Sequence, residues 1–588
     1  MPPRDLTPAA PQWVDQPRPL VSVRQMPMVD WYAPSQLAST AVKAVLSGVF
    51  GRFVDRRELE ALDGRVNDVH NYSRQQQITI DYLADTGDGW NSTYSIASLL
   101  AAPALSVKLP TSQPPLALPM ADVVILGGDQ VYPTPSRREY EDRLVAPFET
   151  AKAWSPETTA PALYALPGNH DWYDGLVSFM RLFLNKGWFA GWRTWQTRSY
   201  FALKLPHRWW LVGVDIQLDS DIDMDQLEYF KWIANEQMQA GDSLILCVAE
   251  PEWVYQGERD CGHWDALPKT APQRNCPPPY ASNLEFLEKR VFERVRTRVV
   301  LAGDLHHYRR HARADGAQKI TSGGGGAFLH PTHGLSQQPL EGGFAPQASS
   351  WPPTDVSRRL PLGNLKLSWN HPRFASLIAC TYVVLGWTVF ADLHQIPFEW
   401  RNAGLAASEV LQKTLNSPGA FGVALLVFFG FYSFADGKRR TFRWVAGSVH
   451  GGLHLALCLT LGWAAVRATD HWGLAFGRPP QLLAAAGLIA AGGFVLGTTL
   501  FGFYLLVCSW LGRHGNESFS SVAAEDWKHF LRLQIGTDGR LTIFPIGLRK
   551  VPRAWKETAS NDPSQPRLEP DGASLDPELI ETPISVSP

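Results

Sequence analysis

The chain has 588 residues, and because a typical domain holds about 150 residues, its length excludes a single compact core. Its 54 basic and 56 acidic residues leave a formal net charge of −2, which excludes a global positive field that would attract nucleic acid or an anionic membrane surface. Six scattered cysteines exclude a disulfide framework and form no CxxC pair for zinc, which favours a reducing compartment.

The first 74 residues are predicted to form a helical extension. Arg4, Asp5 and several prolines stand where a secretory signal peptide would have an apolar segment, so we expect this part to stay in the cytoplasm. Apolar residues recur at helical spacing over 36–62, which indicates either a packed amphipathic helix or a membrane-surface anchor.

Residues 75–334 are predicted to form one α/β domain. Short apolar runs of strand length alternate there with helical stretches, and the runs are 78–84, 123–126, 163–166, 210–216, 244–248 and 299–302. Such alternation is typical of β-strands that are covered by helices. The next residues, 335–373, are rich in Gly, Pro, Ser and Gln and are predicted to be a linker.

A membrane domain is predicted over 374–512. It contains four apolar stretches that approach or exceed the roughly 20 residues needed to cross a bilayer, and the predicted spans are 374–393, 414–435, 444–466 and 482–511. Lys and Arg are more frequent in 358–373 and 438–443 than in the other two loops. The positive-inside rule therefore predicts a multi-pass protein whose two termini and α/β domain face the cytoplasm.

Polar features within these spans allow two interpretations. His450 and His454 lie on one face of the third span, where they are either a functional intramembrane pair or neutral side chains hydrogen-bonded between helices. Gly493 and Gly497 have the GxxxG spacing that suits close helix packing.

The C-terminal residues are expected to contain little further structure. Within 513–557, two apolar runs flank Asp538 and Gly539, which predicts a cytoplasmic β-hairpin. Residues 558–588 are rich in Pro, Asp, Glu and Ser and are predicted to be a disordered tail.

Polar motifs follow four of the predicted strands at their C-terminal ends. The motifs are DTG at 85–87, GDQVY at 128–132, GNHD at 168–171 and GDLH at 303–306. Open α/β sheets place their sites at this edge, where oxygen and imidazole ligands can converge on a pair of metal ions. Together, the four motifs in this order predict a two-metal centre.

The motifs resemble those of the calcineurin-like metallophosphoesterases, over roughly 75–330, and the first two look most like the purple acid phosphatase variant. The resemblance implies a two-sheet α/β sandwich that hydrolyses a phosphate mono- or diester with a metal-bound hydroxide. It implies one ion held by Asp85, Asp129, Tyr132 and His306, and another held by Asp129, Asn169 and two later residues. It also implies that His170 acts on the leaving group and that Asp171 orients it.

Two departures from the family pattern concern the second ion. Asp304 stands where the family has the first histidine of GHxH, and the block expected after strand 244–248 contains no histidine. Glu250 is the favoured replacement there, with Glu252 as the alternative. Two carboxylates in place of two imidazoles favour Mn²⁺, Mg²⁺ or iron over Zn²⁺.

These observations favour a membrane-anchored, metal-dependent phosphoesterase. The alternative is a non-catalytic membrane sensor or scaffold with a degenerate site. The expected partners are a phosphorylated substrate, such as a lipid phosphate or a nucleotide, and the lipid bilayer, with no nucleic acid. Two further segments could border the site: the polar insertion 256–280, and the glycines 323–326, which form either a phosphate-binding loop or a tight turn.

Overall fold

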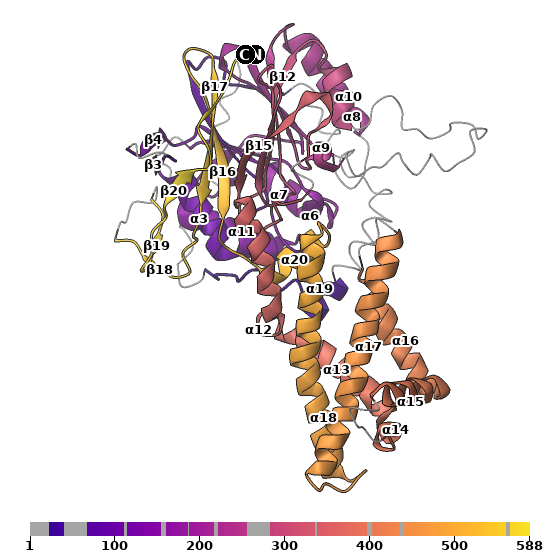
Figure 1. Cartoon of the computed structure of the whole chain (residues 1–588). Helices are drawn as coiled ribbons and strands as arrows, with labels where there is room; N and C mark the ends of the chain where they lie inside the picture. The colour runs from indigo at the N-terminus through magenta and orange to yellow at the C-terminus, as the bar shows by residue number, and fades with distance from the viewer. Residues whose placement is uncertain are drawn as a thin grey trace, which may run out of the picture. The chain divides into compact units, whose positions relative to one another are not determined.

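The computed structural model describes residues 23–39, 68–110, 114–154, 160–185, 187–216, 222–255, 283–334, 338–396, 403–435, 440–559 and 565–588. The chain divides into two compact units (Figure 1). Unit 1 comprises Met1–Val29, Thr40–Ser357 and Ala523–Pro588, and unit 2 comprises Asp30–Ser39 and Arg358–Val522. The polypeptide therefore leaves unit 1 after Ser357 and returns to it at Ala523.

Unit 1 contains two large mixed β-sheets within its described residues. The first has the order β1-β9-β10-β11-β12-β14-β13-β15, and the second has the order β20-β17-β16-β2-β5-β6-β8-β7, with β21 also paired to β17. The first sheet consists of β1 (His70–Asn71), β9 (Phe201–Lys204), β10 (Trp209–Val214), β11 (Ser243–Val248), β12 (Arg296–Ala302), β13 (Tyr308–Ala312), β14 (Gln318–Ser322) and β15 (Ala345–Trp351). The second consists of β2 (Ile78–Leu83), β5 (Val123–Leu126), β6 (Ala162–Ala165), β7 (Trp188–Phe189), β8 (Trp192–Thr194), β16 (Lys528–Ile535), β17 (Leu541–Leu548), β20 (Pro577–Leu579) and β21 (Ile584–Val586).

The two sheets pack face to face, and helices cover their outer faces. Ile80 of β2 and Ile245 of β11 belong to one buried cluster between the sheets. A second cluster joins the outer face of the second sheet to α3, and a third joins the outer face of the first sheet to α8. The helices of unit 1 are α3 (Trp90–Ala101), α4 (Arg137–Glu139), α5 (Ala146–Ala151), α6 (Asn169–Trp172), α7 (Val177–Phe183), α8 (Met224–Trp232), α9 (Glu252–Tyr255), α10 (Asn283–Phe286) and α11 (Thr354–Arg359), which crosses into unit 2. The predicted two-sheet α/β architecture is thus present.

Two segments differ from their sequence-based descriptions. The residues predicted to be a linker contain β15, which pairs with β13, and α11. The residues predicted to be a disordered tail contain β20 and β21, both antiparallel to β17. In each segment a few apolar side chains reach the core: Trp351, Leu579 and Val586 are buried. Overall polar composition obscured these anchors, because a strand of three residues needs only one or two of them.

The predicted hairpin is present, but it is part of the second sheet and does not form a separate C-terminal segment. β16 and β17 are antiparallel and are connected through Asp538 and Gly539 (Figure 1). β16 also pairs with β2. The hairpin therefore lies inside the second sheet, beside the strand that leads to the DTG motif. Two short ladders complete unit 1, β3 (Ala104–Val107) with β4 (Leu116–Pro119) and β18 (Trp555–Glu557) with β19 (Leu568–Pro570).

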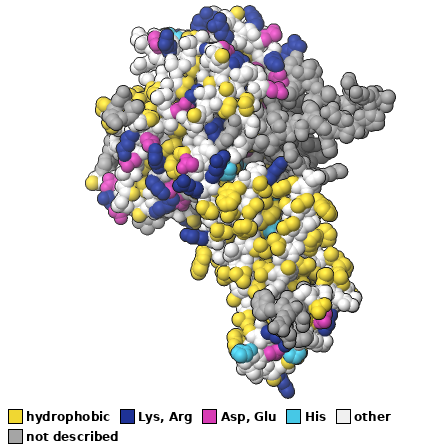
Figure 2. Space-filling model, in the orientation of Figure 1, with side chains coloured by type: hydrophobic (Ala, Val, Ile, Leu, Met, Phe, Trp, Pro, Cys, Tyr) yellow, Lys and Arg dark blue, Asp and Glu magenta, His cyan; other side chains and the backbone are white. Residues whose placement is uncertain are grey.

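Unit 2 is helical in its described residues. Its main helices are α12 (Leu367–Asn370), α13 (Pro372–Thr388), α14 (Phe390–His394), α15 (Ala403–Asn416), α16 (Pro418–Ser433), α17 (Arg440–His471), α18 (Pro479–Gly492), α19 (Thr498–Trp510) and α20 (Gly515–Val522). Phe374, Tyr382, Ile489 and Leu505 contribute to one buried cluster among them. Hydrophobic side chains also cover much of the outer surface of the long helices (Figure 2).

Two helices among the described residues are long and apolar enough to cross a membrane, rather than the four that the sequence predicts. They are Thr441–His471 and Pro479–Trp510. Ser408–Asn416 and Pro418–Ser433 would count as a third only as one broken span, because they are bent by 109°. The first predicted span corresponds to α13, which has 17 residues and ends at Thr388, before Asp392.

Small and polar side chains pack between the helices of unit 2. A Cβ atom on Gly493 would lie 3.0 Å from Cα of Ala379, so the GxxxG glycines allow close approach of α13. Nδ1 of His454 lies 2.8 Å from the Tyr382 hydroxyl, also on α13. This bond supports the interpretation of a histidine hydrogen-bonded between helices.

Candidate metal centre

Three aspartates stand at the carboxyl edges of the two sheets. Asp85 follows β2 and Asp129 follows β5, which are parallel neighbours in the second sheet, whereas Asp304 follows β12 in the first sheet. All three have positive φ values, of 59°, 48° and 64°. Aspartate tolerates this left-handed conformation better than most residues, and here it turns each chain sharply at the strand end. The backbone N–H of Asp304 donates to Oδ1 of Asp85 over 3.2 Å, which joins the two sheets at the site.

The hydroxyl of Tyr132 is the centre of this cluster. It lies 3.0 Å from Oδ1 of Asp85, 3.1 Å from Oδ2 of Asp129 and 2.9 Å from Nε2 of His306. Nδ1 of His306 lies 2.6 Å from the carbonyl of Phe328, so this nitrogen carries the proton and Nε2 faces the cluster as an acceptor. The structure therefore brings together the four residues that the resemblance assigns to one ion.

These four side chains fit a hard or borderline metal ion. Within the described residues, no three His, Cys, Asp or Glu side chains are grouped as a metal site; it is the Tyr132 phenol that links Asp85, Asp129 and His306. With metal–ligand bonds of about 2.1 Å in octahedral geometry, neighbouring ligand atoms lie about 3.0 Å apart. The Tyr132 oxygen lies 2.9–3.1 Å from each of the three other ligand atoms, and Nε2 of His306 lies 3.6 Å from Oδ1 of Asp85. In addition, Oδ2 of fully buried Asp85 has no hydrogen-bond partner.

The second predicted ion position is less completely assembled. Oδ1 of Asn169, at the start of α6, is buried and has no hydrogen-bond partner. Oδ2 of Asp304 accepts a hydrogen bond of 2.5 Å from the Tyr255 hydroxyl, at the end of α9. Glu250 is half-buried and interacts electrostatically with Tyr255, whereas the Glu252 carboxylate accepts from the backbone N–H of Leu284.

His170 and Asp171 occupy different environments. The backbone N–H of His170 donates to Oδ1 of Asp129, and its Nδ1 lies 2.7 Å from the carbonyl of Pro133. Asp171 accepts hydrogen bonds from the backbone N–H groups of Gly168 and Gln130 and from the Tyr140 hydroxyl. The Pro133 carbonyl thus orients the imidazole, and the observed bonds of Asp171 hold the GNHD turn. Gly168 is needed here, because a Cβ atom would lie 2.1 Å from Oδ1 of Asp129.

The carboxylates form a buried negative cluster. Burial and the neighbouring Asp304 raise the pKa of Asp129 to about 7. Burial, Asp129 and Asp304 also raise the pKa of Asp85 well above its usual range. Burial lowers the pKa of His170 to about 4, although Pro133 and Asp304 oppose this effect. A cation bound here would offset the repulsion among the clustered carboxylates and favour their ionised forms.

The glycines 323–326 pack against the strand ends. The N–H of Gly325 donates to the carbonyl of Ala84, and a Cβ atom on Gly324 would lie 1.9 Å from Nδ1 of His529. This arrangement supports the tight-turn interpretation. Just beyond, the half-buried ring of His330 stacks on His306 at a centroid distance of 4.1 Å. The polar insertion 256–280 and most of the N-terminal helix, 40–62, lie outside the described residues.

Sequence reasoning missed Tyr255 and Tyr140. Both lie outside the four motifs, so no spacing rule connected them with the strand ends. Tyr132, by contrast, was identified through the resemblance of the GDQVY motif to that of the purple acid phosphatases.

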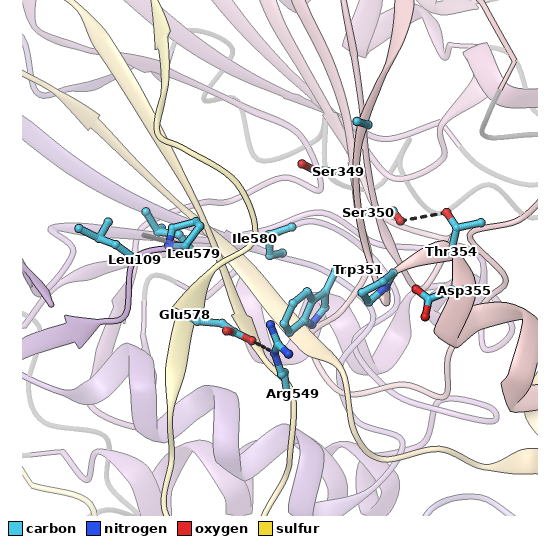
Figure 3. Close-up of a pocket in the computed structure, with 13 residues that line it drawn as sticks. Leu109, Ser349, Ser350, Trp351, Thr354, Asp355, Arg549, Glu578, Leu579 and Ile580 are labelled. Atoms are coloured by element: carbon cyan, nitrogen blue, oxygen red, sulfur yellow. Dashed lines mark hydrogen bonds and ion pairs between the residues drawn. The ribbon is translucent and has the colours of Figure 1, made fainter. Parts of the chain in front are cut away.

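A separate pocket of about 540 Å³ lies elsewhere in unit 1 (Figure 3). It is bordered by β15 and by residues near β17 and β20, with Ser350, Trp351, Arg549 and Glu578 among its lining residues. None of its lining residues is a predicted site residue, so this pocket is distinct from the strand-end cluster.

The comparison with protein families bears directly on these motifs. The model of the calcineurin-like phosphoesterase family matches residues 66–308. The chain contains a calcineurin-like phosphoesterase domain. Members of this family typically bind a pair of metal ions, in agreement with the chemistry of the strand-end residues. None of the curated proteins compared with the chain matches it.

Three solved structures are similar to part of this chain. GAP50, the anchor in the inner membrane complex of Plasmodium, has a TM-score of 0.30 and 10% identity over 46% of this chain and 76% of its own. Purple acid phosphatase PPD1 from yellow lupin (Lupinus luteus) seeds has a TM-score of 0.28 and 14% identity over 44% of this chain and 46% of its own. PhoD has a TM-score of 0.24 and 10% identity over 43% of this chain and 58% of its own. The family assignment rests on the sequence match.

Proposed function

We propose that the chain is a membrane-anchored, metal-dependent phosphoesterase. The observation that carries the proposal is the position of the Tyr132 hydroxyl, within 3.1 Å of Asp85, Asp129 and His306 in a buried cluster. Asp85, Asp129, Tyr132 and His306 would hold one ion, and Asp129, Asn169 and Asp304 would contribute to a second. Bound ions supply a water nucleophile of lowered pKa and stabilise negative charge on the phosphoryl oxygens. The abundance of oxygen ligands favours Mn²⁺, Mg²⁺ or iron over Zn²⁺.

His170 is the proposed general acid for the departing oxygen. Its Nδ1 donates to the Pro133 carbonyl, so Nε2 is the atom that would transfer the proton. A phosphate ester beside the ring adds negative charge, which raises the pKa of His170 from its low value in the free protein and favours its protonated form. Asp171 supports this step indirectly, because it holds the turn that carries the imidazole.

Membrane anchoring by unit 2 is supported by exposed aromatic and apolar side chains. Trp444 and Trp472, near the two ends of α17, are 67% and 57% exposed. They lie 28 positions apart, or about 42 Å along a helix, which is close to the thickness of a bilayer with its interfacial layers. Tryptophans at this spacing are typical of interfacial belts.

An even number of crossings is part of the proposal. β2 precedes the segment Arg358–Val522 of unit 2 and β16 follows it, yet both strands pair in one sheet, which supports a chain that returns to the side it left. The four-span arrangement with both termini in the cytoplasm satisfies this condition, with α13 and α16 as the two shorter crossings.

A metal-by-substrate screen of the purified full-length protein tests the proposed function. The metal-free protein would be supplied separately with Mn²⁺, Mg²⁺, Fe²⁺ or Zn²⁺ and assayed on p-nitrophenyl phosphate, its bis ester, nucleotides and lipid phosphates. We expect hydrolysis of at least one class that depends on the added metal. If metal binds and no ester is hydrolysed, the result favours a metal-binding sensor.

A further inference from the structure

The family pattern has a histidine in the block after the strand that is β11 in this chain, and this chain has no histidine there. Glu250 lies two residues after the end of β11, but Tyr255, five residues later, is the side chain that contacts Asp304. The contact joins the Tyr255 hydroxyl to Oδ2 of Asp304 over 2.5 Å. The short helix α9 brings the phenol to the carboxylate from the end of β11.

From this contact we infer that Tyr255 is a metal ligand at the second position and takes the place of the missing histidine. The inference rests on the proposed function only in requiring a metal pair. The oxygen donors at this position would then be Asp129, Asn169, Asp304 and Tyr255. The chain would thus use one tyrosine at each metal position, Tyr132 at the first and Tyr255 at the second.

The two tyrosines have similar surroundings. The Tyr132 hydroxyl contacts two carboxylates and an imidazole, and the Tyr255 hydroxyl contacts one carboxylate and interacts electrostatically with Asp85 and Glu250. A phenol surrounded by acceptors donates its proton to one of them when no metal is bound, and can coordinate a cation through the same oxygen after losing that proton. The unpartnered Oδ1 of Asn169 provides an independent sign of an unfilled position in this part of the site.

Glu250 is less suited to this role. Glu250 interacts electrostatically with the Tyr255 hydroxyl, whereas that hydroxyl is bonded directly to Asp304. A metal position built without Glu250 needs another donor near Asp304, and Tyr255 is the side chain observed there.

Metal content measured in four forms of the full-length protein tests the inference. The wild type, Tyr255→Phe, Glu250→Gln and Tyr229→Phe would be equilibrated with Mn²⁺, freed of excess metal and analysed by mass spectrometry for metal equivalents per chain. Tyr229→Phe is the matched control, because its buried hydroxyl also donates to an oxygen acceptor, the Asp68 carbonyl, and Tyr229 belongs to none of the strand-end motifs. We expect two equivalents in the wild type, Glu250→Gln and the control, and one in Tyr255→Phe.

A further variant, Tyr255→His, restores the residue type of the family. It should recover the second equivalent and shift its preference from Mn²⁺ toward Zn²⁺. This variant also guards against a folding defect in Tyr255→Phe, which circular dichroism and thermal unfolding would detect. Two equivalents in a folded Tyr255→Phe, or the loss of one in Glu250→Gln, would overturn the inference. If the wild type holds two ions, folded Tyr255→Phe holds one, and the wild type hydrolyses no ester, the result contradicts the proposed function and supports this ligand.

Discussion

Arg532 and Asp81 form a fully buried, bidentate ion pair between two strands that the helical segment Arg358–Val522 separates in the sequence. The guanidinium Nε and Nη2 donate to the two carboxylate oxygens, each over 2.7 Å, and both side chains are 0% exposed. Asp81 lies in β2, four residues before Asp85, and Arg532 faces it from β16. The residues after unit 2 therefore help to hold the strand that positions the metal cluster.

Breaking this pair should destabilise unit 1 strongly. We expect Arg532→Met to lower the free energy of unfolding by about 3–5 kcal/mol, because it leaves the Asp81 carboxylate buried without its partner. The double variant Asp81→Leu with Arg532→Met should lose much less unfolding free energy, because neither charge is then left buried without a partner. Arg540→Met, at an exposed arginine of the same hairpin, is the control. Equal losses in the single and double variants, measured by denaturant unfolding, would contradict this account.

His170→Asn should separate catalysis from metal binding. The backbone N–H that bonds Asp129 is retained, so metal content should stay near that of the wild type. Turnover should fall by roughly 10² to 10⁴, the usual contribution of a general acid. Metal analysis and kinetics of the same preparation check both points, with exposed His207→Asn as the control. Loss of metal in His170→Asn would mean that the imidazole is a ligand.

The buried carboxylates predict an unusual pH dependence of stability without metal. The folded-state pKa of Asp129, about 7, lies above the ordinary aspartate pKa of 3.8, so the folded state binds more protons than the unfolded state between these two pH values. The stability that comes from the protonated carboxyl is therefore fully present below pH 3.8 and is lost as the pH rises through 7. This loss is at most about 4 kcal/mol, since one pKa unit corresponds to about 1.4 kcal/mol.

Asp129→Asn removes the titrating group and tests this effect. In EDTA, the variant should be more stable than the wild type at pH 8, and the two should converge toward pH 4. Thermal unfolding across this range measures the difference, and added Mn²⁺ should stabilise only the wild type at pH 8. A constant difference between the two proteins at all pH values would show that Asp129 does not titrate in this window.

Reporter insertions test the number of membrane crossings. The four-span topology places 402–412 outside and 437–442 in the cytoplasm, as the distribution of Lys and Arg indicates. A topology with only α17 and α18–α19 as spans would place both segments in the cytoplasm. A reporter in 473–477 should be external in either topology and serves as the control. An external reporter after Pro588 would contradict an even number of crossings.

The sequence was sufficient to predict that the site aspartates lie at the ends of strands. Asp85, Asp129 and Asp304 follow apolar runs that indeed form β2, β5 and β12, because continuous apolar runs are typical of buried parallel strands. The extent of the domain was not predictable in this way. β16 was assigned to a separate hairpin, since no local pattern shows that it pairs with β2, more than 440 positions earlier.

The contacts that refine the site were also beyond sequence reasoning. The bond between Tyr255 and Asp304 joins α9 to the end of β12, and the bond from His170 to the Pro133 carbonyl depends on the path of a loop. Neither contact has a fixed spacing along the chain. In unit 2, composition indicated four spans, but α13 ends at Thr388, and the second predicted span, 414–435, is interrupted after Asn416 by the bend between α15 and α16.

The most direct test of the central claim compares the wild type with Asp129→Ala. Purified full-length proteins would be stripped of metal, supplied with Mn²⁺ and assayed on p-nitrophenyl phosphate and its bis ester, with bound metal measured in the same samples. Exposed Asp225→Ala is the matched control. Asp129 is the carboxylate expected to serve both ions, so the account predicts metal-dependent hydrolysis by the wild type and the control, and loss of both bound metal and hydrolysis in Asp129→Ala. Undiminished hydrolysis by Asp129→Ala would contradict it.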